Sequence, residues 1–175
     1  MSTARAALVK RARAIRLAIF DVDGVLTDGT IYIGKRGEEF KAFNILDGHG
    51  LKMLRGAGVT TAILSGRSHK AVDRRAKELS IDHVIQGRSE KVPEFEKLIK
   101  RLSVPESACA YMGDDLPDLA VMRRCGLAVA VANAVDAVKA EAHYVTRAAG
   151  GHGAVREACE LILRARGQLA AAGAV

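Results

Sequence analysis

The sequence predicts an α/β protein with three layers around a mostly parallel sheet, and two observations predict it. Short apolar runs alternate along the chain with longer segments of helical spacing, which is the pattern of β-α-β units. Several conspicuous polar residues, among them Asp21, Ser65 and Asp114, directly follow such an apolar run. Ligands of parallel sheets bind beyond the carboxyl ends of the strands, so these residues are expected to meet there. The length of 175 residues favours one domain over 1–175.

The elements follow from this alternation in chain order. Leu17-Ala-Ile-Phe20 predicts a buried strand, because it is a short apolar run that ends at an acid. Later apolar runs predict strands at 59–64, 83–85, 109–112, 127–131 and 144–145. Between them, apolar residues at helical spacing predict helices at 50–57, 68–79, 91–102, 116–125, 136–142 and 153–166. Gly58 ends the first helix, and Ser68 is a candidate N-cap for the second.

Three further segments interrupt or flank the alternation. The stretches 30–33 and 39–43 flank Gly34-Lys-Arg-Gly37, which is typical of a glycine turn, so a β-hairpin is expected within 29–44. The basic N-terminal arm, 1–15, would suit a polyanion such as nucleic acid or a membrane surface, but no nucleic-acid motif accompanies it. It is therefore interpreted as a solvated amphipathic helix leaning on the body. The tail 167–175 is rich in alanine and glycine and is expected to be mobile.

Composition argues against several classes of protein. The net charge is +7, but aromatic residues are only 4% and tryptophan is absent, which argues against a nucleic-acid partner. No apolar run approaches the length of a membrane span, so no membrane partner is expected. The three cysteines form no C-x-x-C pair and are interpreted as reduced thiols of a cytoplasmic protein. The positive charge also suits an anionic substrate.

The chemistry is expected at four places. Asp21 and Asp23 follow the first strand, with a glycine directly after them for a tight turn. Ser65 follows the second strand, where a hydroxyl can donate to a phosphoryl oxygen, and Lys91 opens a helix. Asp114 and Asp115 follow a third strand and offer the carboxylate oxygens that Mg²⁺ prefers. Asp118 is interpreted as an acid at a helix N-terminus.

Together these motifs resemble the haloacid dehalogenase (HAD) superfamily of phosphatases, whose order is D-x-D, Ser/Thr, Lys and G-D-D-x-x-D, over Asp21 to Asp118. The resemblance implies a Rossmann-like HAD fold, with Asp21 as nucleophile and Asp23 as acid and base. It implies that Ser65 and Lys91 hold the transferring oxygens. Mg²⁺ would bind Asp21, Asp114 and the Asp23 carbonyl, with Asp115 close by. The segments between the motifs leave no room for a cap domain.

The chain from about 15 to 166 resembles the 3-deoxy-D-manno-octulosonate 8-phosphate (KDO 8-phosphate) phosphatase branch. The stretches that carry this are 21–29, 41–48, 113–118, 144–147 and 149–157. The resemblance implies a role in KDO and lipopolysaccharide biosynthesis, a small acidic sugar phosphate as substrate, and a homotetramer through the hairpin. It implies substrate contacts from Asn44, Asp47, Gly48, Lys52, Arg67 and Arg75. Leu46 and His152 stand where this branch frequently has arginine.

Other readings stay open at this point. Within the enzyme class, the substrate could be another acidic sugar phosphate, such as N-acylneuraminate 9-phosphate. A signalling receiver domain also combines acids, Mg²⁺, Ser/Thr and Lys, although its phosphoacceptor ends the third strand and not the first. A regulatory or oligomerisation module without catalysis is the remaining alternative.

Overall fold

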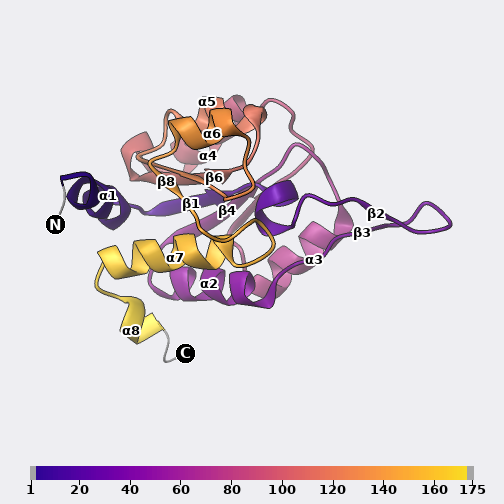
Figure 1. Cartoon of the computed structure of the whole chain (residues 1–175), viewed down its shortest axis with the longest axis horizontal. Helices are drawn as coiled ribbons and strands as arrows, with labels where there is room; N and C mark the ends of the chain where they lie inside the picture. The colour runs from indigo at the N-terminus through magenta and orange to yellow at the C-terminus, as the bar shows by residue number, and fades with distance from the viewer. Residues whose placement is uncertain (1–2, 173–175) are drawn as a thin grey trace.

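The computed structural model describes residues 3–172 and confirms the predicted α/β class (Figure 1). Its six-stranded sheet has the order β5-β4-β1-β6-β7-β8, and every neighbouring pair is parallel. The strands are β1 (Leu17–Phe20), β4 (Thr60–Leu64), β5 (His83–Ile85), β6 (Cys109–Gly113), β7 (Leu127–Ala130) and β8 (Tyr144–Val145). The four central strands are almost fully buried, as expected where helices cover both faces of a parallel sheet.

Helices cover the sheet on two sides (Figure 1). One layer contains α2 (Ile45–Gly56), α3 (Lys70–Leu79) and α7 (Ala154–Ala165), and α2 packs closely along α7. The opposite layer contains α4 (Lys91–Leu102), α5 (Leu119–Met122) and α6 (Asp136–Glu141). Short turns, η2 (Glu106–Ala108) and η3 (Leu116–Asp118), precede β6 and α5. The result is the predicted three-layer arrangement.

The hairpin projects from this body as β2 (Tyr32–Ile33) paired antiparallel with β3 (Glu39–Phe40) (Figure 1). It exposes large apolar side chains, because Ile33 is 72% exposed and Phe40 is 58% exposed. Between β1 and β4 the chain forms the hairpin, one helix and the tight turn η1 (Val22–Leu26). A hairpin with so much exposed apolar surface gains little stability on its own in water.

Both ends of the described chain form helices. The basic arm contains α1 (Thr3–Arg13), which packs on α7 and buries Ala12, and Ile15 just beyond it is also buried. Within the predicted tail, Leu169–Ala172 form the short helix α8 with Ala172 buried, and 173–175 lie outside the described residues. None of the described helices has the length and apolarity needed to cross a membrane.

Three predicted boundaries were wrong, each for a local reason. The helix predicted at 50–57 begins at Ile45, because the Asn44 side chain accepts a hydrogen bond from the Leu46 amide and caps it. His69, not Ser68, caps α3 by accepting from the Ala71 amide. The helix predicted at 116–125 is divided into η3 and α5, where Asp115 and Asp118 form a capping box.

Candidate active site

Three adjacent strands bring the predicted polar residues together. β4 and β6 lie on either side of β1, and Phe20 at the end of β1 is in register with Ile63 and Met112. Since all three strands run parallel, the residues that follow them lie at one edge of the sheet. A cavity of about 400 Å³ opens there. It is lined by Asp21, Asp23, Gly29, Ser65, Gly66, Arg67, Ser89, Lys91, Asp114, Asp115, Pro117 and Asp118.

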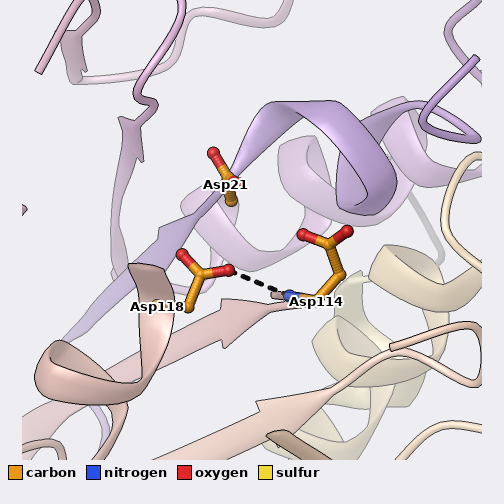
Figure 2. Close-up of side chains that lie close together, drawn as sticks. All are labelled: Asp21, Asp114 and Asp118. Carbon is orange, nitrogen blue, oxygen red and sulfur yellow. Dashed lines mark hydrogen bonds between the residues drawn. The ribbon is translucent and has the colours of Figure 1, made fainter. Parts of the chain in front are cut away.

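The centre of this cavity is a cluster of carboxylates. Asp21, Asp114 and Asp118 each have an oxygen within 4.8 Å of the others (Figure 2). Asp21 Oδ1 is buried and has no hydrogen-bond partner. A buried carboxylate oxygen without a partner is unfavourable unless a cation or a donor completes its surroundings. The all-oxygen donor set therefore fits a hard divalent cation such as Mg²⁺.

Two glycines of the motifs let the carboxylates approach the backbone. A Cβ on Gly24 would lie 2.0 Å from Asp114 Oδ2, and a Cβ on Gly113 would lie 2.5 Å from the Asp118 carboxyl group. Gly24 also has φ of 86°, in the left-handed region that favours glycine. The glycines in D-x-D-G and G-D-D are therefore required by the packing of the acids themselves.

Burial and mutual repulsion make these acids hard to ionise in the metal-free protein. Burial raises the pKa of Asp21 to about 6; Lys91 opposes the rise and the charge of Asp118 adds to it. Burial, together with the neighbouring charges of Asp118, Asp21 and Asp115, raises the pKa of Asp114 to about 7. A cation bound here would therefore displace protons as well as neutralise charge.

Lys91 contacts two acids of this cluster and is almost fully buried. Its ammonium is 3.1 Å from Asp21 Oδ2 and 2.6 Å from Asp118 Oδ1. The Tyr111 hydroxyl donates to the same Asp118 oxygen at 2.7 Å, and the other oxygen accepts from the amides of Asp114 and Asp115. Burial lowers the pKa of Lys91, but Asp21 and Asp118 outweigh it and leave the pKa above its ordinary value.

The interpretation of Asp118 as a helix acid was therefore incomplete. Asp118 belongs to a capping box, but it is 1% exposed and joins the carboxylate cluster to Lys91 and Tyr111. The third acid of G-D-D-x-x-D was the sequence signal for it. Asp115, in contrast, is exposed and accepts from the Leu116 amide through Oδ1. Ser65 is 2% exposed and lines the cavity wall.

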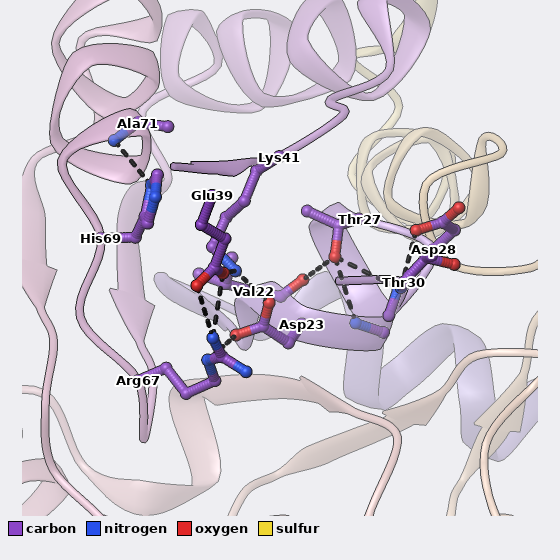
Figure 3. Close-up of polar contacts among 12 residues, drawn as sticks. Val22, Asp23, Thr27, Asp28, Thr30, Glu39, Lys41, Arg67, His69 and Ala71 are labelled. Atoms are coloured by element: carbon purple, nitrogen blue, oxygen red, sulfur yellow. Dashed lines mark hydrogen bonds and ion pairs between the residues drawn. The ribbon is translucent and has the colours of Figure 1, made fainter. Parts of the chain in front are cut away.

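Asp23 lies on the hairpin side of the cavity among charged partners (Figure 3). Asp23 Oδ1 accepts a hydrogen bond from the Lys41 ammonium, and Oδ2 is 3.9 Å from Arg67 Nε. Glu39 of β3 accepts two hydrogen bonds from Arg67 Nη2, at 2.9 and 2.8 Å. Asp23 and Arg67 were predicted from the sequence as site residues, whereas Lys41 and Glu39 were not. The signals for them were the position of both at the base of the hairpin and, for Lys41, the stretch 41–48 that carries the family resemblance.

A second loop supports the turn that contains Asp23. Asn133 donates to the Gly24 carbonyl at 3.3 Å, and its Oδ1 accepts from the Gly150 amide at 2.7 Å. The Gly151 amide donates to the Val25 carbonyl at 3.0 Å. The glycine-rich segment predicted as specific to one phosphatase branch thus lies directly against η1.

The remaining predicted substrate residues lie away from this cavity, on α2 and α3. Asp47 is 1% exposed and accepts from the amides of Gly153 and Arg156 at the start of α7. Burial raises the pKa of Asp47, while these amides oppose the rise.

Asn44 caps α2 and donates to the Gly151 carbonyl, and Arg75 donates to the Asn44 carbonyl and lies directly against Gly48. Lys52 lines a different cavity of about 410 Å³ between α2 and α8.

Comparisons with known proteins find phosphatases that are similar to this chain in sequence and fold. Residues 82–157 match the haloacid dehalogenase-like hydrolase family. The chain is 48% identical over 162 residues to 3-deoxy-D-manno-octulosonate 8-phosphate phosphatase KdsC of Escherichia coli (strain K12), covering 93% of this chain and 86% of that protein.

Two solved structures are similar over nearly the whole fold. A probable YrbI family phosphatase from Pseudomonas syringae is 56% identical, with a TM-score of 0.95 and coverage of 97% of this chain and 96% of that one. The KDO 8-phosphate phosphatase of Moraxella catarrhalis, in complex with a magnesium ion, a phosphate ion and KDO, is 46% identical, with a TM-score of 0.93 and coverage of 95% and 96%.

Proposed function

Because this chain belongs to the KDO 8-phosphate phosphatases of the haloacid dehalogenase superfamily, we propose that Asp21 carries the phosphoryl group while the chain hydrolyses KDO 8-phosphate to KDO and phosphate. The single observation that supports this role best is the geometry of Asp21. One of its oxygens is buried without a partner, and the other lies 3.1 Å from the Lys91 ammonium. The reaction belongs to KDO biosynthesis, and we infer that it takes place in the cytoplasm.

In the first step an Asp21 carboxylate oxygen forms a bond to phosphorus as the phosphorus–sugar oxygen bond breaks. The electron pair of that bond stays on the sugar oxygen, which takes a proton from the Asp23 carboxyl group and leaves as an alcohol. In the second step Asp23, now a carboxylate, accepts a proton from water as the water oxygen bonds to phosphorus. The bond between phosphorus and Asp21 breaks, which releases phosphate and restores both acids.

The other residues of the cavity serve this transfer electrostatically. Lys91 is buried and positively charged, so it reduces the repulsion between Asp21 and the phosphate. We propose that the Ser65 hydroxyl donates to a phosphoryl oxygen. Asp21 and Asp114 side chains, with the Asp23 carbonyl, would hold a divalent cation, for which we propose Mg²⁺, and Asp115 would bind it through water. When bound, that cation neutralises charge on the phosphoryl oxygens and on the acids.

Arg67 is the best-placed cation for the sugar carboxylate among the predicted substrate contacts. It lines the cavity, and its side chain is 47% exposed. A guanidinium can bind a carboxylate through two parallel hydrogen bonds. In the free chain Arg67 already contacts a carboxylate, because its Nη2 donates to both oxygens of Glu39. For the α2 and α3 residues Asn44, Asp47, Gly48, Lys52 and Arg75, the contacts described above favour a supporting role, and substrate contact stays a prediction.

We also propose that the chain forms a homotetramer through the hairpin. Ile31, Tyr32, Ile33 and Phe40 expose apolar surface on a two-stranded element that packs poorly on its own subunit. Burial between subunits would stabilise it and would cover an active site that has no cap domain. Light scattering should give a mass near four chains, and Ile33→Asp should lower it. An active monomer at working concentration would exclude the proposal.

The test of the reaction is phosphate release with Mg²⁺ from KDO 8-phosphate, N-acylneuraminate 9-phosphate and simple sugar phosphates. Asp21→Asn should abolish turnover while the variant stays folded, because the amide is isosteric but is not a nucleophile. Asp136→Asn, at an exposed site on α6, is the matched control and should keep full activity. Turnover by the Asp21→Asn variant at the wild-type rate would exclude Asp21 as the nucleophile. A preference for N-acylneuraminate 9-phosphate would exclude the proposed sugar.

A further inference from the structure

Lys41 is a buried cation, and its principal partner is Asp23, the residue proposed as the general acid. It directly follows β3, and its side chain is 3% exposed. Its ammonium donates to Asp23 Oδ1 and lies 3.4 Å from Glu39 Oε1 (Figure 3). An ammonium removed from water is strongly unfavourable unless it is paired and hydrogen-bonded. The contact with Asp23 is therefore a fixed feature of the folded site.

The two cations that face Asp23 are not equivalent. Arg67 approaches Oδ2 at 3.9 Å, but it is 47% exposed and makes its close contacts with Glu39. Exposed ion pairs hold side chains weakly, because water competes for both partners. Lys41 is buried and contacts both Asp23 and Glu39. Of these two cations, Lys41 is the one that can fix the direction of the Asp23 carboxyl group.

We propose that Lys41 is a positioning residue that holds the Asp23 carboxyl group where it can transfer its proton to the leaving sugar oxygen. This inference rests on the proposed function, in which Asp23 is the acid. Asp23 follows the nucleophile strand on a tight turn, and its side chain is 26% exposed, so it can occupy several rotamers unless a partner selects one. The base of the hairpin thereby becomes part of the catalytic apparatus.

Direct contact between Lys41 and the substrate is the competing explanation. The residues that line the cavity include Asp23 and Arg67, but Lys41 is not among the described residues that do so. Lys41 therefore reaches the reacting atoms through Asp23. This difference can be measured in the first step, where a positioned acid matters only when the leaving group needs a proton. The second step, in which Asp23 is the base, is the same for every ester.

The experiment compares two esters in one set of variants. KDO 8-phosphate releases a sugar alkoxide that must be protonated, whereas p-nitrophenyl phosphate releases a stable phenolate without a proton. With enzyme in excess, in single turnover, release of the alcohol or phenol reports the first step alone. Lys41→Met should lower this first-step rate constant for KDO 8-phosphate by about 10- to 100-fold, part of the 10²–10⁴ that general acid catalysis contributes. For p-nitrophenyl phosphate the loss should stay below about threefold, and KM for either ester should change little. Lys41→Arg, which keeps a donor to Asp23, should recover most of the loss.

The double variant separates positioning from general damage to the fold. If Lys41 acts through Asp23, Lys41→Met should cause no further loss of the first-step rate constant for KDO 8-phosphate in an Asp23→Ala background. Lys97→Met removes an exposed lysine from α4 and should leave all rates unchanged. If Lys41→Met does not fold, Lys41→Gln supplies the same comparison, because it keeps a polar group without the charge.

Two results would overturn the inference: equal losses of the first-step rate constant on both esters, or losses that multiply in the double variant. A rise in KM confined to KDO 8-phosphate would assign Lys41 to the substrate carboxylate and would overturn it too. Absence of Mg²⁺-dependent phosphate release by the wild-type chain would instead refute the proposed function. The two failures are therefore distinguishable.

Discussion

Lys91 and Asp118 form a buried ion pair with an N–O distance of 2.6 Å, and the Lys91 ammonium also contacts Asp21, the proposed nucleophile. The pair comes from two segments far apart in the chain, the start of α4 and the end of η3. The Asp118 carboxylate also accepts a hydrogen bond from the Tyr111 hydroxyl, which holds it in place. Asp118 in turn holds the Lys91 ammonium in place. The positive charge of Lys91 is therefore held next to Asp21, in a site from which water is largely excluded.

Asp118→Asn should therefore reduce both stability and activity. The substitution leaves Lys91 buried with only Asp21 as a charged partner, and breaking a buried pair costs about 3–5 kcal/mol. Urea denaturation should show a lower free energy of unfolding, and kcat should fall because Lys91 is no longer held. Glu94→Gln disrupts an exposed ion pair and should leave the midpoint unchanged. An Asp118→Asn protein with wild-type stability would contradict the structural role of this pair.

The sheet edge was predictable from sequence because apolar runs and the acids that follow them are local features. Asp21, Ser65 and Asp114 were placed at strand ends by this pattern, and parallel strands then bring them together. The role of Asp118 was not predictable in the same way, because it depends on Tyr111 and Lys91 from other segments.

Lys41 and Asp47 show the same limit for side-chain contacts. A lysine after a hairpin strand is ordinarily at the surface, yet Lys41 is buried against Asp23. Asp47 was predicted as a substrate contact by family resemblance, and the fold gives it the amides of α7 as partners. Alternation and spacing define the elements, whereas the partner of a side chain depends on which elements the tertiary fold brings together.

The metal-free protein should lose stability as pH rises. An aspartate in the unfolded chain ionises near 3.8, whereas Asp114 in the folded chain has a pKa of about 7. Between these values the folded state binds more protons than the unfolded state, so the free energy of unfolding falls with increasing pH. Asp21, with a pKa of about 6, contributes in the same direction. The loss should be on the order of a few kcal/mol and complete above pH 7.

This dependence can be measured by urea denaturation in a chelator between pH 5 and pH 8. Saturating Mg²⁺ should restore stability, most strongly at the high end, because the cation binds the ionised acids. Asp114→Asn removes the most perturbed acid and should flatten the curve in chelator. If the free energy of unfolding of the metal-free protein rose from pH 5 to pH 8, the result would contradict the raised pKa values of Asp114 and Asp21.

Asp47 should act on stability and not on substrate affinity. Asp47→Ala leaves the Gly153 and Arg156 amides without an acceptor, and losing such a cap costs about 1–2 kcal/mol. The melting temperature should fall, while KM for KDO 8-phosphate should stay within about threefold of wild type. Asp136→Ala, at an exposed site, controls for the loss of a charge. A rise in KM of more than tenfold, specific to KDO 8-phosphate, would instead support the predicted substrate contact.

Gly150 should be intolerant of even one added carbon, for steric reasons alone. A Cβ there would lie 1.8 Å from the Gly24 carbonyl oxygen, and this neighbour is backbone that cannot rotate away. The φ angle of Gly150 is not in the left-handed region, so alanine could adopt its backbone conformation. Gly150→Ala must therefore displace either the 150 loop or η1, and overpacking of this kind costs about 1–3 kcal/mol.

The displacement should also reach the chemistry. Asn133 joins Gly150 to the Gly24 carbonyl, and Gly24 is the residue after Asp23. A shift of about 1 Å in a catalytic group can cost on the order of 10²-fold in rate, so kcat for KDO 8-phosphate should fall by more than tenfold. Gly56→Ala, where nothing lies within 4 Å of the added carbon, should retain full activity and stability. Equal behaviour of the two alanine variants would show that the 150 loop does not support the nucleophile turn.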